Sequence, residues 1–479
     1  MSLRGFAALF VSFCFAATGD VKGANQTSTV PKFTTKDRVV FIGDSITHGG
    51  SYHKDIFLFS ATRYPHQPFK YYNAGISGDT AKGTMARFDQ DIALHRPTKA
   101  TIMLGMNDVG SRLYQSLPKT AKAQQQRKTQ QAAIRKEYLA NMRAIADALS
   151  QVNSEIIFIT PSIYDQTLVA DTFNNVGRND ELAVYAKELT NLARQYQAPV
   201  VDFQTPMLKI NKKWQRQDPS RTIVSHDRVH PQELGHFLMA YSFLKAQHGS
   251  SFVADIQIDA NRQAITRLHN AKLTQALVSS ANQLAFACKL LALPFPLTSK
   301  QQSLLNDIPF QQDLNQQRLT VTGLAAGDYQ LSIAGKKVGV YSQPELATGI
   351  NLASNQNTPM YQQALAVKAL NDERAKASGV LRNIKHVEFT MLSQYLGTDL
   401  TDINQVRDIL AAHLELSAGK PWHDYLTRVI DSYLEYSADE QMLRNKIEDL
   451  FVQIYQVNQT KSHVWQLTKN LAGFIEHVI

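Results

Sequence analysis

The sequence predicts an α/β fold: a doubly wound, five-stranded parallel sheet in residues 36–250, then a small β-rich domain in residues 251–346 and a helical C-terminal region in residues 358–479. Short, continuous apolar runs rich in Val, Ile and Phe alternate with helical segments over about 210 residues, and turn residues bound each run. Parallel sheets covered by helices on both faces have strands of this kind. Beyond residue 250 the pattern changes, first to short alternating strands and then to long helices.

Five apolar runs are predicted to form the parallel strands: 38–42, 69–72, 100–104, 155–160 and 199–203. The segments between them carry apolar residues at a spacing of 3.6, which indicates amphipathic helices. The clearest helices span 128–149, 182–196 and 232–245. Because doubly wound sheets bind ligands outside the carboxyl ends of their strands, we expect a site in the loops that follow these runs.

The β-rich domain is predicted from five strands at 252–258, 283–290, 318–321, 329–333 and 337–341. Turns at 323–328 and 334–335 are expected to join the last three as hairpins. The C-terminal helices are interpreted as a structural brace, with dimerisation as the alternative. The residues expected to be buried in this brace are Met360, Leu365, Val367, Leu370 and Leu381.

Composition excludes several classes of protein. The 479 residues are 44% hydrophobic and 19% charged, which excludes a disordered or collagenous chain. The two cysteines, Cys14 and Cys288, exclude a disulfide scaffold, and Cys288 is expected to be a buried, unreactive thiol. No window holds the roughly 20 apolar residues of a membrane span. The net charge of +9 could attract an anionic polymer, but the sequence lacks the pattern of a nucleic-acid module.

The N-terminus predicts export. Arg4 precedes an apolar run at 5–17, and small residues follow it, as in a cleavable signal peptide spanning residues 1–19. Cleavage there leaves Cys288 as the single cysteine. An exported chain without disulfides is typical of a bacterial periplasmic or secreted protein.

Four loop segments carry candidate chemistry. Ser45 follows the first strand at a predicted helix entry, where backbone N–H groups support developing negative charge. Gly78, in the loop after the second strand, allows a backbone amide to approach a ligand closely. Asn107, after the third strand, offers an uncharged amide donor. Asp227 lies three residues before His230, a spacing that lets the carboxylate fix one imidazole tautomer.

Together these segments supply a nucleophile, two kinds of N–H donor and an oriented base, which is the set that acyl transfer requires. The alternative of a zinc site at His226, His230 and His236 lacks supporting cysteines or carboxylates. The sequence therefore predicts an ester hydrolase that needs neither a metal nor an organic cofactor.

The motifs Gly-Asp-Ser-Ile-Thr at 43–47, the Gly78 loop, Gly-Met-Asn-Asp at 105–108 and Asp-Arg-Val-His at 227–230 resemble the four blocks of the SGNH (GDSL) hydrolase superfamily. The resemblance covers residues 36–247 and implies a flavodoxin-like sheet. It also implies Ser45 as nucleophile, His230 as base, Asp227 as its orienting acid, and an oxyanion hole made by Ser45, Gly78 and Asn107. Ile46 stands where the family name has Leu, and the α/β-hydrolase elbow Gly-x-Ser-x-Gly is absent.

The identity of the substrate is the property that the sequence determines least. Polar and aromatic side chains near the expected site favour sugar hydroxyls over a long acyl chain. The candidate substrate contacts are Asp44, His48, Tyr52, Arg63, Tyr164 and Asp165. The leading hypothesis is hydrolysis of O-acetyl esters on a carbohydrate, which is also what enzymes resembling this layout often do. The alternatives are a lipid or short-chain acyl ester hydrolase, an acetyltransferase, and a glycan-binding scaffold with a vestigial triad. The oligomeric state is left open.

Overall fold

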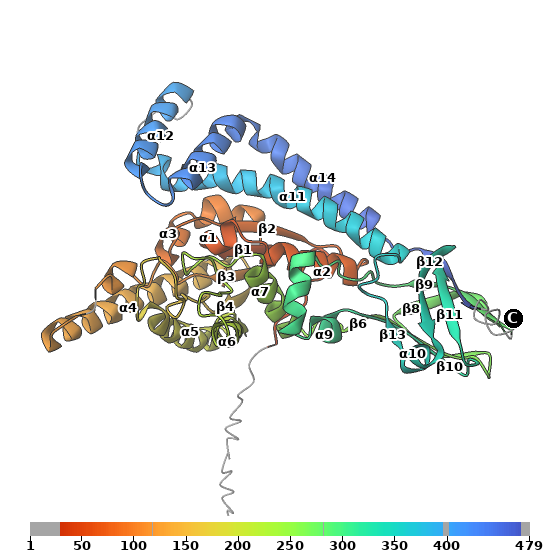
Figure 1. Ribbon diagram of the computed structural model, residues 1–479. Helices are drawn as coiled ribbons and strands as arrows, with labels where there is room; N and C mark the ends of the chain where they lie inside the picture. Colours follow the sequence, from red (N-terminus) through yellow and green to blue (C-terminus); the bar gives the residue numbers. More distant parts are fainter. Residues whose placement is uncertain (1–28, 117, 281, 396–401, 471–479) are drawn as a thin grey trace, which may run out of the picture.

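The computed structural model describes residues 29–116, 118–280, 282–395 and 402–470 (Figure 1). The predicted signal peptide at 1–19 lies outside these ranges. The first part of the chain forms a sheet of five strands, all parallel, in the order β2-β1-β3-β4-β5, which confirms the predicted fold class. The strands are β1 (Arg38–Gly43), β2 (Lys70–Gly75), β3 (Lys99–Met103), β4 (Glu155–Ile159) and β5 (Val200–Val201).

Helices cover both faces of this sheet. Since successive side chains along a strand point to opposite faces, almost every strand position is therefore buried. Val39 and Phe41 of β1 pack with helices α2, α6 and α7, whereas Val40 and Ile42 pack with α4 and α5. This arrangement explains why the strand sequences are continuously apolar. The helices of this domain are α1 (Ser45–His48), α2 (Tyr52–Arg63), α3 (Ala81–Ala86), α4 (Ala121–Gln151), α5 (Arg178–Gln195), α6 (Gln204–Gln215) and α7 (Glu233–Ala246).

Two further sheets make up the β-rich part. One has the order β13-β10-β6-β7 and the other β12-β11-β14-β9-β8. The first contains β6 (Phe252–Asp259), β7 (Ala264–His269), β10 (Gln316–Thr322) and β13 (Ile350–Asn351). The second contains β8 (Ala271–Ser279), β9 (Gln283–Leu290), β11 (Asp328–Ile333), β12 (Lys336–Ser342) and β14 (Ser462–Lys469). Short helices α8 (Ser299–Gln302), α9 (Phe310–Leu314) and α10 (Gln343–Thr348) accompany them.

One of the two predicted hairpins is wrong. Strand β10 does not pair with β11; it pairs in parallel with β6, and the turn at 323–327 carries the chain into the other sheet. Alternation along a strand reports which face is buried but not which strand lies beside it. The second hairpin is confirmed, because β11 and β12 pair through Ala334 and Gly335. Both turn residues have positive φ, of 53° and 75°, as tight two-residue hairpins require.

The C-terminal region is helical up to residue 457 and then returns to the β-rich part. Its helices are α11 (Pro359–Thr390), α12 (Ile403–Ser417), α13 (His423–Tyr436) and α14 (Glu440–Val457). Strand β14 then inserts between β11 and β9, which corrects the expectation of helices throughout 358–479. Trp465 and Leu467 of β14 are buried while Val464 is exposed, so the strand carries a period-2 pattern.

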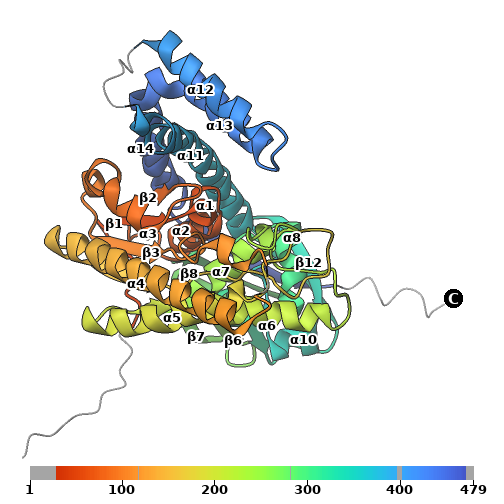
Figure 2. The same ribbon diagram turned by 90° about the vertical axis from the view of Figure 1, so that its left-hand side faces the viewer.

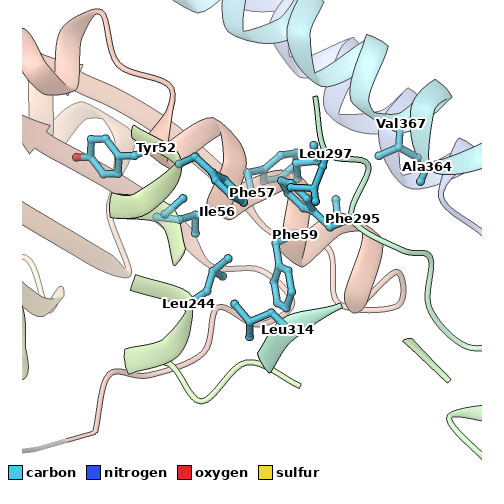
Figure 3. Close-up of a cluster of buried hydrophobic side chains, with 14 of the residues drawn as sticks. Tyr52, Ile56, Phe57, Phe59, Leu244, Phe295, Leu297, Leu314, Ala364 and Val367 are labelled. Carbon is cyan, nitrogen blue, oxygen red and sulfur yellow. The ribbon is translucent and has the colours of Figure 1, made fainter. Parts of the chain in front are cut away.

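The long helices α11 and α14 lie side by side across the α/β domain, above α2 and β2 (Figures 1 and 2). Met360, Val367 and Leu381 are buried as expected for a brace, whereas Leu365 is 36% exposed and points away from the core. Helix α2 is the common centre of the packing. Figure 3 shows Phe57 and Phe59 of this helix among Leu244, Phe295, Leu297, Leu314, Ala364 and Val367 from the other parts of the chain. Cys288 is buried in β9 with a free thiol, as predicted.

Candidate active site

Ser45 is the first residue of α1, directly after β1. The preceding Asp44 caps this helix, because its Oδ1 accepts the N–H of Ile46 at 3.0 Å. A strand that ends in a capped helix turn places the serine hydroxyl at the carboxyl edge of the sheet. Asp44 itself is buried, and burial raises the pKa of its carboxyl to about 6.

Ser45, His230 and Asp227 form a hydrogen-bonded chain. The Ser45 Oγ lies 2.7 Å from His230 Nε2, and His230 Nδ1 lies 2.6 Å from Asp227 Oδ2. The other carboxylate oxygen of Asp227 accepts the backbone N–H groups of Val229 and His230, at 2.8 and 2.9 Å. Asp227 is therefore locked in a turn that aims one oxygen at the imidazole. This geometry lets the imidazole accept a proton from the serine hydroxyl.

The charge of Asp227 strengthens the hydrogen bonds between Ser45, His230 and Asp227. Partial burial acts to raise the pKa of Asp227, but hydrogen bonds from the ring and backbone of His230 bring it below its ordinary value. Burial acts to lower the pKa of His230, but the hydrogen bond and the charge of Asp227, with a contribution from Asp44, raise it overall. The ring is thus made more basic, as a general base for a hydroxyl should be.

The three residues expected to supply N–H donors, Ser45, Gly78 and Asn107, line the same cavity. In the part of the chain that the structure describes, no hydrogen bond uses the backbone N–H of Ser45 or of Gly78. Gly78 adopts φ +80°, a left-handed conformation that favours glycine. Asn107 donates one Nδ2 hydrogen to the carbonyl of Asp79 at 2.9 Å, which orients its amide beside the Gly78 loop. These donors can stabilise an oxyanion near Ser45.

The Gly78 loop is held from both sides. On one side Arg87 binds Asp79, with Nη2 and Oδ2 2.8 Å apart. On the other side the Ser77 hydroxyl lies 2.6 Å from the Tyr425 hydroxyl of α13, and the Ser77 N–H donates to His48 Nδ1 at 3.2 Å. A fixed loop keeps its donors in place before the reaction begins, which is what electrostatic stabilisation requires.

These groups open into a cavity of about 1460 Å³. Ser45, His230, Gly78 and Asn107 line it from the α/β domain, and residues of α11 and α13 line it from the C-terminal region. Of the six residues predicted to contact substrate, His48 is the one that lines this cavity. Burial, with the nearby positive charges, lowers the pKa of His48 to about 3, so its imidazole stays neutral.

The other predicted substrate contacts do not reach the cavity. Tyr52 belongs to the buried cluster of Figure 3. Its hydroxyl lies 3.0 Å from the Thr47 hydroxyl. Arg63 donates to the backbone carbonyls of Ser250 and Leu314. Asp44 is occupied in capping α1. These polar groups bond to neighbouring protein groups, and none of the three side chains lines the cavity, so their contact with substrate stays a prediction without support from this geometry.

Tyr164 and Asp165 are likewise buried, in the loop after β4. Asp165 Oδ2 accepts hydrogen bonds from Asn211 at 2.8 Å and Thr222 at 2.7 Å, so its carboxylate fixes this loop and not a ligand. The hydroxyl of Tyr164 accepts the N–H of Asn175 at 2.7 Å. Aromatic and acidic character alone does not distinguish a loop anchor from a binding group.

Sequence reasoning missed Arg228, which lies between Asp227 and His230. Its buried guanidinium donates to four backbone carbonyls, including those of Asp165 and Leu168 at 3.1 and 2.8 Å. Its backbone adopts φ +70°, a conformation that arginine rarely takes. The turn that presents the imidazole is therefore anchored to the loop after β4. The signal that could have identified it is a basic residue inside the Asp-x-x-His motif.

In the described ranges, no group of three or more His, Cys, Asp or Glu side chains is arranged to hold a metal ion. In the same ranges no helix combines the length and apolarity needed to cross a membrane.

Residues 41–238 match the GDSL-like Lipase/Acylhydrolase family. An acetylxylan esterase from Geobacillus stearothermophilus is 24% identical over 230 residues, or 45% of this chain and 95% of that protein. A solved structure of that organism's acetylxylan esterase is 26% identical over 46% of this chain and 97% of its own, with a TM-score of 0.36. The structure of a gut microbial diltiazem-metabolizing enzyme covers 93% of this chain and 100% of its own, with 29% identity and a TM-score of 0.82. That likeness extends beyond the α/β domain into the β-rich and helical parts.

Proposed function

We propose that this serine ester hydrolase, whose residues 41–238 match the GDSL-like family, removes O-acetyl groups from a carbohydrate. The observation that carries the reaction is the continuous chain from Ser45 Oγ through His230 to Asp227, with contacts of 2.7 and 2.6 Å. A serine hydroxyl has little nucleophilicity without such a base.

In the first half-reaction His230 Nε2 accepts the hydroxyl proton as Ser45 Oγ bonds to the ester carbonyl carbon. Asp227 stabilises the imidazolium that forms, through its contact with Nδ1. The tetrahedral intermediate collapses, the C–O bond to the sugar breaks, and His230 returns the proton to the leaving alcohol. In the second half-reaction the same ring accepts a proton from water as the water oxygen bonds to the acyl carbon. The bond from that carbon to Ser45 Oγ then breaks, His230 returns the proton to Ser45, and acetate leaves.

The negative charge of the intermediate falls on the former carbonyl oxygen. We assign its stabilisation to the N–H groups of Ser45 and Gly78 and to the Nδ2 of Asn107. Each well-aimed donor of this kind lowers the barrier by about 3 kcal/mol. The anchoring of Asn107 to Asp79 supports this role, because a donor that is already oriented needs no reorganisation during the reaction.

The choice of an acetylated carbohydrate rests on the cavity and on one relative. Hydroxyl, amide and imidazole groups line the cavity beside aromatic rings, a mixture that suits sugar hydroxyls and ring faces. Such polar groups include Ser77, Thr80, Asn383 and His386. The acetylxylan esterase relative acts on an acetylated polysaccharide by its name. Export by the N-terminal segment is part of the same proposal, and N-terminal sequencing of the mature protein tests it.

The test is a release assay with the wild type and Ser45→Ala, on aryl esters from C2 to C12 and on acetylated xylo-oligosaccharides. We expect a preference for C2, acetate release from the oligosaccharides, and a loss of activity in Ser45→Ala of about a thousandfold or more. Ser150→Ala, on the exposed side of α4, is the matched control and keeps full activity.

Better turnover of C8 than of C2 would overturn the acetyl assignment in favour of a lipid or longer acyl ester. Activity that survives Ser45→Ala would overturn the mechanism and leave a scaffold role. Transfer of acetyl to an added sugar in place of acetate release would identify an acetyltransferase.

A further inference from the structure

The cavity has two walls that come from distant parts of the chain. Ser45 and His230 belong to the α/β domain, whereas the opposite wall is formed by α11, α13 and the segment that precedes α13. Ligand cavities of about 300–1,000 Å³ enclose a drug-sized molecule. At about 1460 Å³ this cavity far exceeds the needs of an acetyl group, so most of its volume is available to the alcohol part of the ester.

The opposite wall presents an exposed aromatic side chain. Trp422, the residue before α13, is 55% exposed and lines the cavity together with Phe389 and Tyr425. Large aromatic side chains that remain exposed in a concave site offer a flat apolar face with a polar edge. Asn383 and His386 of α11 lie on the same wall and supply hydrogen-bonding groups.

This wall is fixed relative to Ser45. The Tyr425 hydroxyl lies 2.6 Å from the hydroxyl of Ser77, next to Gly78. Asn383 Oδ1 lies 3.2 Å from His48 Nε2. Deeper in the interface, Arg382 of α11 forms a bidentate pair with Asp91, at 2.7 and 2.8 Å. A ligand therefore meets a preformed second wall, which reduces the cost of ordering it on binding.

The charged side chains that α11 contributes to the cavity are Asp372, which pairs with Lys54, Arg374, which bonds to Tyr71, and Lys376. The imidazoles of His48 and His386, by contrast, are uncharged. Burial lowers the pKa of His48 to about 3 and that of His386 to about 4, each reinforced by the positive charge of Arg382. Both imidazoles are neutral at physiological pH and offer donors and acceptors without net charge. Neutral polar groups around an aromatic face match a polyhydroxylated ring better than a fatty chain or a phosphate.

We propose that the α11–α13 wall is the binding site for the sugar backbone of the ester, with Trp422 stacking on the ring that carries or neighbours the acetylated hydroxyl. This inference rests on the proposed function and adds the part of the chain that selects the substrate. The α/β domain performs the acyl transfer, and the C-terminal helices determine which acetylated alcohol reaches Ser45.

The experiment compares kcat/KM on an acetylated xylotetraose with kcat/KM on an aryl acetate, for the wild type, Trp422→Ala and Trp422→Phe. We expect the ratio of the two values to fall about tenfold or more in Trp422→Ala, mainly through KM. Trp422→Phe restores most of the ratio because it keeps an aromatic face. The matched control is Leu416→Ala, at an exposed position of α12 outside the cavity, which leaves the ratio unchanged.

Binding without turnover gives a second measurement. Calorimetric titration of Ser45→Ala with the acetylated xylotetraose is compared with the same titration of the Ser45→Ala, Trp422→Ala double variant, and we expect about tenfold weaker binding in the latter. Thermal melting confirms that both proteins are folded.

The outcomes separate the two proposals. An unchanged ratio and unchanged affinity in Trp422→Ala, with a wild type that deacetylates the oligosaccharide, overturn the role of this wall and leave the proposed function intact. A wild type that cleaves aryl acetate but neither binds nor deacetylates the oligosaccharide overturns both the carbohydrate assignment and this inference. An equal loss on both substrates shows that Trp422 acts only on the fold, and overturns the inference as well.

Discussion

Arg382 joins the C-terminal helices to the loop that carries Gly78, and its replacement gives a sharp prediction. Its guanidinium donates to both oxygens of Asp91 and, through Nε, to the carbonyl of Gly75 at 3.1 Å. Asp91 also binds Arg87, which in turn binds Asp79 in the Gly78 loop. The perturbation is Arg382→Met, which keeps the apolar part of the side chain but removes all three hydrogen bonds.

The expected cost follows from burial. Arg382 and Asp91 are both nearly inaccessible to solvent, and removing one partner of a buried ion pair destabilises a protein by about 3–5 kcal/mol. Because Arg87 still pairs with Asp91, we expect the lower value, about 3 kcal/mol. For a domain of about 200 residues this corresponds to a melting temperature lower by about 6–12 °C.

The effect should depend on pH. Burial acts to raise the pKa of Asp91, but the charge and hydrogen bonds of Arg382, followed by the charge of Arg87, bring it well below its ordinary value of 3.8. A carboxyl with a depressed pKa contributes stability above its unfolded pKa and loses it as the pH falls through the folded value. In Arg382→Met the pKa of Asp91 rises. The difference in stability between wild type and variant is therefore constant from neutral pH down to about 4, and it narrows only as the pH falls below the ordinary value of 3.8 towards the depressed folded value.

Differential scanning calorimetry at pH 7 and at about pH 2.5, below the ordinary pKa of an aspartate, measures both effects. Lys82→Met is the matched control, because Lys82 pairs with Glu137 at 3.6 Å on the exposed surface and should cost no more than about 1 kcal/mol. An Arg382→Met variant that melts within a degree of this control at pH 7 would refute the reasoning. A melting difference that is the same at both pH values would show that Asp91 is not the group responsible.

Two further predictions concern the reaction. Asp227→Asn should lower kcat/KM by at least about a hundredfold and shift the rising limb of the pH profile of kcat/KM to lower pH. The reason is that His230 must be neutral to accept a proton, and Asp227 raises the pKa of His230. A pH profile with an unchanged midpoint would contradict the assigned pair. Asn107→Ala should lower kcat about 10²–10³-fold with a much smaller change in KM, because the Asn107 amide acts on the transition state. Steady-state kinetics on an aryl acetate measure both constants. A change confined to KM would show that Asn107 is not part of the oxyanion hole.

The α/β domain could be predicted from the sequence because each of its strands and motifs is marked by residues close together in the chain. Each strand is a short apolar run buried on both faces, and the loops after β1, β2 and β3 meet wherever such strands lie in parallel. The Asp-x-x-His spacing places Asp227 and His230 in one turn, so their contact needs no distant information. The pairing of β10 with β6 was missed because their separation of some 60 residues leaves no trace in either strand.

The far wall of the cavity could not be predicted for the same reason. Trp422 lies about 380 residues from Ser45, and only the packing of α11 and α14 over α2 brings the two together. The predicted substrate contact of Arg63 has the opposite problem, because a residue that looks exposed in the sequence is buried. Arg63 ends α2, a helix buried on nearly all sides, and its charged side chain bonds to backbone carbonyls. Burial on all sides of a short helix is a tertiary property.

The central position of β14 has a consequence for biosynthesis. The sheet that contains it cannot be completed until residue 469 has left the ribosome, because β14 bridges β9 and β11. The residues of the proposed hydrolytic site are all synthesised by residue 230, whereas α11–α14 span Pro359–Val457 and follow much later. A nascent chain therefore has its reactive serine before it has the aromatic surface opposite, and the apolar side of α2 stays uncovered meanwhile. Chaperone dependence during synthesis should come from that interval.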